Sequence, residues 1–199
     1  MTEARAKARP EPGESRFAQG FALFAECLLT GVWIAVAALG LVTYPAAFAA
    51  GARHLGRRLA HERGGWREFA SDFRAAVRHG WLVGVAGWAA LAVVWIDVRA
   101  VRDGLPGGPL VGAVGVLALI GAAVAGLRAA ADWHPGASWR SLLARAGRRT
   151  VLDPAGSFLL VGGLAVVVCS AWFSAPLAVA VLGAVAAAAV AVEERYRRR

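Results

Sequence analysis

The chain has 199 residues, of which 58% are hydrophobic and 18% charged, and its formal net charge is +9. A mean hydropathy of +0.55, with the apolar residues in long blocks, excludes an ordinary soluble domain. In such a chain an excess of arginine is typical of loops beside anionic lipid, which argues against nucleic acid as the partner. Cys27 and Cys169 both lie inside apolar blocks, and neither has metal-ligand spacing to a histidine. We therefore expect no disulfide, no metal and no cofactor.

The N-terminal part of the chain predicts a tail followed by a first membrane span. Residues 1–16 are charged and contain two prolines, so we expect them to be disordered. The apolar block 17–44 is interrupted only by Glu26. It is longer than the hydrophobic region of about 7–15 residues in a secretory signal peptide, which favours a retained span. Pro45 is expected to break or kink this helix.

The segment 46–78 is rich in arginine, and it predicts two short helices. Residues 46–61 form the first, and Gly64–Gly65 separates it from the second. In the second, aromatic residues recur at helical spacing: Trp66, Phe69 and Phe73. This pattern is typical of an interfacial amphipathic helix at the level of the lipid headgroups, with the arginines of the loop contacting anionic headgroups.

The remaining apolar blocks predict four further spans. A helix over 157–192 would be about 54 Å long, far more than a bilayer requires, so we expect the chain to turn at Ser174–Pro176. Two GxxxG matches, at Gly80–Gly84 and Gly108–Gly112, indicate close packing of helices within the chain. The fold class is therefore all-α, a polytopic integral membrane protein with about five transmembrane helices in one domain over 17–199. The predicted spans are 17–44, 80–96, 110–127, 157–173 and 176–192.

The distribution of positive charge predicts which side of the membrane each loop occupies. Loop 46–78 carries seven Lys or Arg residues, loop 128–156 five and the C-terminal tail four. The N-terminal tail, the turn 97–109 and the turn 173–176 carry only six together. The positive-inside rule then places both large loops and the C-terminus in the cytoplasm and the N-terminus outside. Because arginine and alanine predominate, as in GC-rich bacterial genomes, we expect a bacterial protein.

The stretch "TGVWIAVAALGLVTYPAAFAAGARHLGRRLAHERGGWREFASDFRAAVRHGW", residues 30–81, contains a recognisable series of motifs. They are Trp33 late in the first span, Pro45-Ala46, a basic stretch over 53–63, and the series Trp66, Phe69, Phe73. This region resembles the signature region of YesL-like bacterial membrane proteins, a domain-of-unknown-function family. One departure is Thr30, where the family often has an asparagine. The resemblance implies an inner-membrane protein of about five spans, often encoded beside carbohydrate-uptake systems, and it implies no activity.

Glu26 is the one acid well inside an apolar block, and an intramembrane carboxylate is costly unless it is paired. We interpret it either as a functional group with Arg16 or a loop arginine as its partner, or as a structural residue that reaches the interface or a neighbouring helix. A second possibility is a metal or proton site at Asp132, His134 and Asp153, although "DWHP" is also typical of a helix end. The other histidines are expected to be solvated or in contact with headgroups. The candidate functional or partner surface comprises Glu26, Trp33, Pro45, Arg57, Arg58, Trp66, Phe69 and Phe73.

The sequence contains no P-loop, dinucleotide-binding loop, HExxH motif or nucleophile–base pair, so we expect a protein that is not an enzyme. The favoured hypothesis is an accessory protein or regulator of a membrane system such as carbohydrate uptake, associated with a membrane transport complex. The alternative is a small oligomeric transporter or channel with Glu26 in its pathway.

Overall fold

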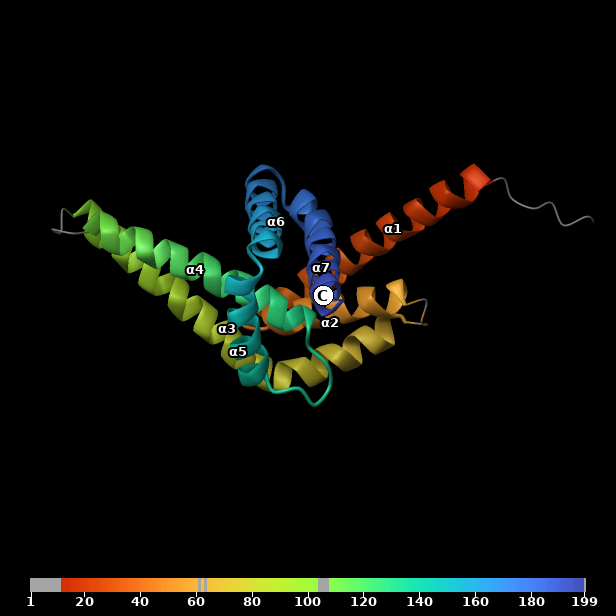
Figure 1. The fold of residues 1–199 in the computed structure, drawn as a ribbon, viewed down its shortest axis with the longest axis horizontal. Coiled ribbons are helices and arrows are strands. Elements are labelled where there is room, and N and C mark those ends of the chain that lie inside the picture. Colours follow the sequence, from red (N-terminus) through yellow and green to blue (C-terminus); the bar gives the residue numbers. More distant parts are fainter. Residues whose placement is uncertain (1–11, 61, 63, 104–107, 199) are drawn as a thin grey trace, which may run out of the picture.

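The computed structural model describes residues 12–60, 62, 64–103 and 108–198, and within these residues the chain is all-helical (Figure 1). The helices are α1 (Pro12–Ala38), α2 (Tyr44–Leu59), α3 (Trp66–Arg102), α4 (Gly108–Ala131), α5 (Trp139–Leu152), α6 (Pro154–Phe173) and α7 (Ala175–Arg197). Five of them, α1, α3, α4, α6 and α7, are long and apolar enough to cross a membrane. The predicted fold class and the number of spans are therefore confirmed.

The first span differs from its predicted bounds at both ends. Residues 12–16, expected in a disordered tail, form the start of α1; Pro12 is compatible with this, because a proline in the first helical turn loses no helical hydrogen bond. Residues 1–11 of that tail lie outside the described residues. At the other end α1 stops at Ala38, six residues early, because the chain turns at Leu41, whose φ is +57°. The hydroxyl of Thr43 closes this turn by donating to the carbonyl oxygen of Ala37 at 2.7 Å.

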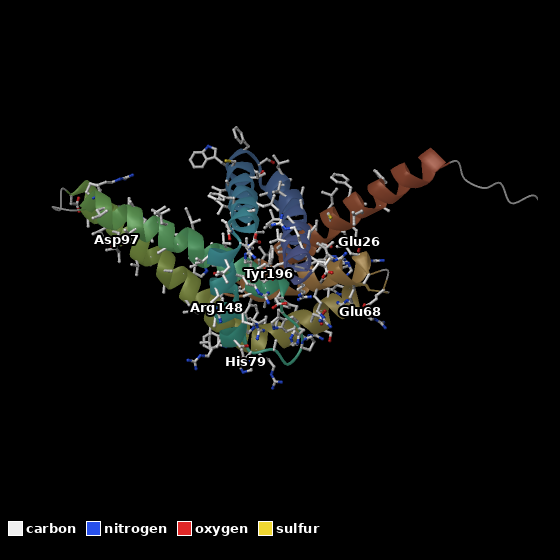
Figure 2. All side chains as sticks on the ribbon, viewed as in Figure 1. Glu26, Glu68, His79, Asp97, Arg148 and Tyr196 are labelled. Carbon is white, nitrogen blue, oxygen red and sulfur yellow. The ribbon has the colours of Figure 1, made fainter. Side chains whose placement is uncertain are left out.

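Helix α3 joins two elements that the sequence predicts as separate. The expected interfacial helix over 66–78 and the expected span over 80–96 are halves of one 37-residue helix. The glycines inside α3 each cost only about 1 kcal/mol in helix propensity, which does not interrupt a helix of this length. In Figure 1 α3 changes direction near its middle, and His79, labelled in Figure 2, lies at this bend. The first half therefore packs against α2, while the second half extends outward beside α4.

The central element of the fold is α2, which carries several of the arginines in the loop 46–78. Its residues from Pro45 to Ala52 are buried, as are His54 and Leu55. It contacts α1, α3, α4 and α7, and its run of alanines lets four helices approach it closely. The predicted helix over 46–61 is thus confirmed in outline, but it is an internal helix and not part of an exposed loop.

Figure 1 shows α1, the α3–α4 pair and the α6–α7 pair diverging from a common centre. We call this centre the hub; it consists of α2, α5, the first half of α3 and the C-terminal ends of α4 and α7. The diverging arms expose large apolar side chains, for example Leu110 at 73% and Trp172 at 88%. Such exposure is typical of surfaces that face lipid, where apolar side chains are not transferred into water. Ion pairs between helices gather in the hub, which is where the candidate site lies.

Glycines set the closest contacts between helices. A Cβ at Gly183 of α7 would overlap the carbonyl oxygen of Cys27 in α1, so these two helices can cross only at a residue without a side chain. A Cβ at Gly84 would overlap the carbonyl oxygen of Val42, and one at Gly80 would press on the ring of Trp139. The first GxxxG match therefore serves packing within the chain, as expected.

Candidate functional site

Glu26 is paired with two side chains of α2. Its Oε1 lies 2.6 Å from Nε2 of His54 and accepts a hydrogen bond of 3.0 Å from Nε of Arg58. His54 is fully buried, whereas 19% of the Glu26 side chain is exposed. The expected arginine partner of Glu26 is therefore Arg58. His54, expected to be solvated or in contact with headgroups, is instead part of the site; that prediction was wrong, because the turn after α1 lets α2 lie along it with His54 opposite Glu26.

Aromatic rings from α1 and α3 pack against one another and, through Trp33, against His54. The ring of Trp33 lies 5.0 Å from that of His54, 5.6 Å from that of Trp66 and 5.4 Å from that of Phe69. Edge-to-face rings at such spacings stabilise the packing by about 0.5–1.5 kcal/mol a pair beyond the burial of their area. We call Glu26, Trp33, His54, Arg58, Trp66 and Phe69 the aromatic–ionic cluster. Figure 2 shows Glu26 on α1 beside α2.

The structure brings five of the eight predicted residues into this cluster and places three beside it. Pro45 is buried in the first turn of α2. Phe73 is half-buried and stacks on Phe69 at 6.4 Å. Arg57 pairs with Asp72 of α3 at 2.5 Å, and Arg53 approaches the same carboxylate at 3.3 Å.

The expected aromatic partner surface is only partly available. Phe69 is 1% exposed, whereas Trp66 is 54% exposed. Likewise, the arginines of α2, expected to contact lipid headgroups, pair with carboxylates of α1 and α3. The sequence signal that could have shown this pairing is the presence of an acid on either side of the arginine-rich stretch, Glu26 in α1 and Asp72 in α3.

A second ionic network joins α4, α5, α6 and α7, and sequence reasoning missed it. Arg128, near the end of α4, is fully buried and donates to Asp153 Oδ2 and Glu193 Oε1, both at 3.1 Å. Arg149 bonds the second oxygen of Glu193 at 2.5 Å. We call this set the Arg128 network; its members are Arg128, Asp132, Arg149, Asp153, Glu193, Arg195 and Arg197.

Asp153 has a double role in this network. Its Oδ1 accepts from the Gly156 N–H and so caps α6. Burial raises the pKa of Asp153, but the hydrogen bonds from Arg128 and Gly156 and the charges of Arg128 and Arg195 together lower it below its ordinary value. The carboxylate is thus held ionised as a structural anchor for the start of α6.

The residues weighed as a metal or proton site do not assemble around His134. Asp132 pairs with Arg149 and Arg197, and His134 is exposed, with Nδ1 3.3 Å from the Pro135 carbonyl oxygen. Over residues 12–60, 62, 64–103 and 108–198, no group of three or more His, Cys, Asp or Glu side chains could hold a metal ion. The two acids weighed for this site, Asp132 and Asp153, are instead engaged with arginines.

The comparisons with known proteins gave no match: no family model, curated protein or solved structure is similar enough to this chain to be reported. The resemblance of residues 30–81 to YesL-like proteins therefore stays a prediction from the sequence. What is added by the structure is that the motif residues Trp33, Trp66 and Phe69 are in mutual contact.

Proposed function

We propose that this chain is a YesL-like, non-enzymatic protein of the bacterial inner membrane that assists or regulates a membrane system such as carbohydrate uptake. The observation that carries this proposal is the aromatic–ionic cluster. Its charged groups are used to join α1 and α2, and its one exposed aromatic ring is that of Trp66, at 54%. Ion pairs of this kind fix the positions of the helices, so that the exposed ring is presented to a partner in a defined orientation. Paired and half-covered charges offer little to a reacting substrate.

The partner surface is the part of the hub around Trp66. An exposed tryptophan next to arginines is a typical anchor of protein interfaces, because it buries a large area at a small entropic cost. The ring of Trp66 packs against those of Phe69 and Trp33, and these contacts restrict its orientation. Arg67 is exposed beside it. A membrane transport complex presenting an apolar pocket with acidic residues would fit this surface.

Co-purification of the full chain in mild detergent tests the accessory role. We expect transporter subunits, identified by mass spectrometry, to follow the wild type and to be depleted at least tenfold with Trp66→Ala. Trp172→Ala is the matched control, because Trp172 is also exposed but lies at the outer end of the α6–α7 arm. The proposal fails if no transport protein is recovered, or if both variants lose it equally.

We further propose that the hub and the C-terminus face the cytoplasm. The arms end away from the hub at the start of α1 and at the α3–α4 and α6–α7 junctions, which supports opposite sides for the two ends of the chain (Figure 1). The test uses a chain without Cys27 and Cys169 and a thiol reagent that does not cross membranes. Ser174→Cys should react in intact spheroplasts and Arg148→Cys should not; the reverse result contradicts this sidedness.

A second candidate function, a small oligomeric transporter or channel, is favoured by the contact between Glu26 and His54. A carboxylate inside a membrane span, with an imidazole 2.6 Å away, could pass a proton or bind a cation. Reconstitution in liposomes with proton, cation and sugar flux assays tests it. Flux that is lost with Glu26→Gln would establish this function in place of the accessory role.

A further inference from the structure

We propose that a cleft in the hub binds a phosphate ester. The cleft has a volume of about 940 Å³ and lies where the C-terminal ends of α2, α4 and α7 meet. This volume falls within the range of roughly 300–1,000 Å³ that is usual for small-molecule sites. The cleft is separate from the aromatic–ionic cluster, none of whose six residues lines it.

The walls of the cleft combine an apolar part and a cationic part. Ala52 and Trp133, both buried, and the half-buried Val190 contribute apolar surface. Five arginines, from α2 and from the end of α7 with the residue that follows it, contribute the cationic part: Arg53, Arg57, Arg195, Arg197 and Arg198. A ligand that fits must therefore present both a strongly anionic group and a carbon skeleton.

Guanidinium donors exceed carboxylate acceptors around the cleft. Asp72 is shared by Arg53 and Arg57. The Arg128 network contains four arginines and three acids, and each of its carboxylates likewise pairs with two arginines. Each guanidinium has five N–H donors, yet Arg57, Arg195 and Arg197 each donate only one hydrogen bond, through Nη2, to the described side chains. The cleft is thus rich in donors that an additional anion could use.

The acids that line the cleft limit this excess without removing it. Asp132 pairs with Arg197, and Glu194 pairs with Arg198 at 3.0 Å, so both carboxylates are already neutralised by a cation of the cleft. Glu62 contributes one further carboxylate at the edge of the cleft. Several arginines surrounding a small volume favour a tetrahedral anion, because its oxygens can accept charge-assisted hydrogen bonds from several directions at once.

A phosphate ester meets both requirements, since it joins a doubly or singly charged phosphate to carbon. Two sources are chemically possible: the headgroup of an anionic phospholipid and a soluble phosphorylated compound. Both would place the phosphate among the arginines and the carbon part against Trp133 and Val190. This inference does not depend on the proposed accessory role, because the cleft residues differ from those of the partner surface.

The experiment measures the thermal denaturation of the full chain by tryptophan fluorescence. In detergent, glycerol 3-phosphate is titrated against sodium chloride at equal ionic strength. In a second arm, nanodiscs of phosphatidylglycerol are compared with nanodiscs of phosphatidylcholine. The test variants are Arg53→Gln combined with Arg195→Gln and, should this chain fail to fold, Arg198→Gln, since Arg198 is exposed and pairs only within α7 among the described residues. The control variant is Arg148→Gln, an exposed arginine of α5 outside the cleft.

We expect the phosphate compound to raise the Tm of the wild type beyond the effect of chloride, in one of the two arms. Stabilisation by glycerol 3-phosphate identifies a soluble ligand, and stabilisation in phosphatidylglycerol alone identifies a lipid. Each arginine removed should raise the apparent Kd about tenfold, as expected for one charge-assisted hydrogen bond, so the double variant should bind more weakly than Arg198→Gln. The control should bind as the wild type does. The proposal is overturned if neither arm stabilises the chain, or if Arg148→Gln weakens the effect as much as the cleft variants do.

Discussion

Replacing Arg128 with methionine would leave two buried carboxylates without the cation that they share. Asp153 is 4% exposed and Glu193 is 2% exposed, and Arg128 itself is fully buried. Methionine fills a similar volume without charge, so the change removes the ionic contacts and the hydrogen bonds and leaves the packing of the site largely intact. The variant therefore isolates the electrostatic contribution of Arg128 to the joining of α4, α6 and α7.

The expected loss follows from what remains in the network. Removing one member of a buried ion pair costs about 3–5 kcal/mol, because an uncompensated charge stays behind. Here Arg149 still bonds Glu193 at 2.5 Å, and Arg195 still lies 3.4 Å from Asp153. These remaining cations compensate part of the charge, so we expect a loss at the lower end, about 3 kcal/mol in the free energy of unfolding.

Denaturant titration in mixed micelles, followed by tryptophan fluorescence, measures this loss. Arg148→Met, on the exposed face of α5, is the control and should change the free energy of unfolding by less than about 0.5 kcal/mol. Adding Asp153→Asn and Glu193→Gln to Arg128→Met should restore part of the loss, since amides are less costly to bury than carboxylates. A loss below about 1 kcal/mol for Arg128→Met would refute the interpretation that this network stabilises the hub.

Three further predictions concern other parts of the fold. The pKa of Asp153 is lowered in the folded chain, so its contribution to stability is present above its unfolded pKa of about 3.9 and is lost as the pH falls through the lower folded pKa. In an acid titration, the free energy of unfolding of Asp153→Asn should therefore decline less steeply with falling pH than that of the wild type. Gly183→Val should cost about 1–3 kcal/mol in unfolding free energy, because its side chain would overlap the Cys27 carbonyl oxygen. Gly162→Val is the control and should unfold as the wild type does, because the space at its Cβ is open; equal losses in the two variants would contradict the close crossing of α1 and α7. Trp139→Phe removes the indole donor that satisfies a carbonyl of α3 at 3.2 Å and should destabilise the contact of α5 with α3 by about 1 kcal/mol, measured as faster amide hydrogen exchange in α5; unchanged exchange would show that this hydrogen bond is dispensable.

Much of the fold could be predicted because the insertion of a segment into a membrane depends mainly on the residues of that segment. The apolar length of each segment predicts five spans, and the turn expected at Ser174–Pro176 is found, with Ser174 ending α6 and preceding α7. The aromatic spacing of Trp66 and Phe69 likewise predicts a helix, which the structure contains as the first half of α3. Each of these predictions sums properties of neighbouring residues, so no knowledge of distant segments is needed.

The candidate site could be predicted only in part, because its pairing is not local. The sequence indicated that Glu26 needs an arginine, but only the folded chain shows that the partner is Arg58 and that His54, 28 positions from Glu26, lies fully buried between helices. Arg128 is the clearest case: it lies 65 positions from Glu193, and in the sequence it is one more arginine at the end of a span.

The sequence of each segment thus determines whether that segment inserts into a membrane, since the free energy of moving it out of water is nearly the sum of the contributions of its own residues. The burial of a charge follows a different rule, because its cost depends on whether a remote helix brings an opposite charge to it. That is why composition and spacing indicated five spans and the arginine-rich segments between them, while the tertiary structure alone decided which arginines pair with acids in the hub and which line its cleft.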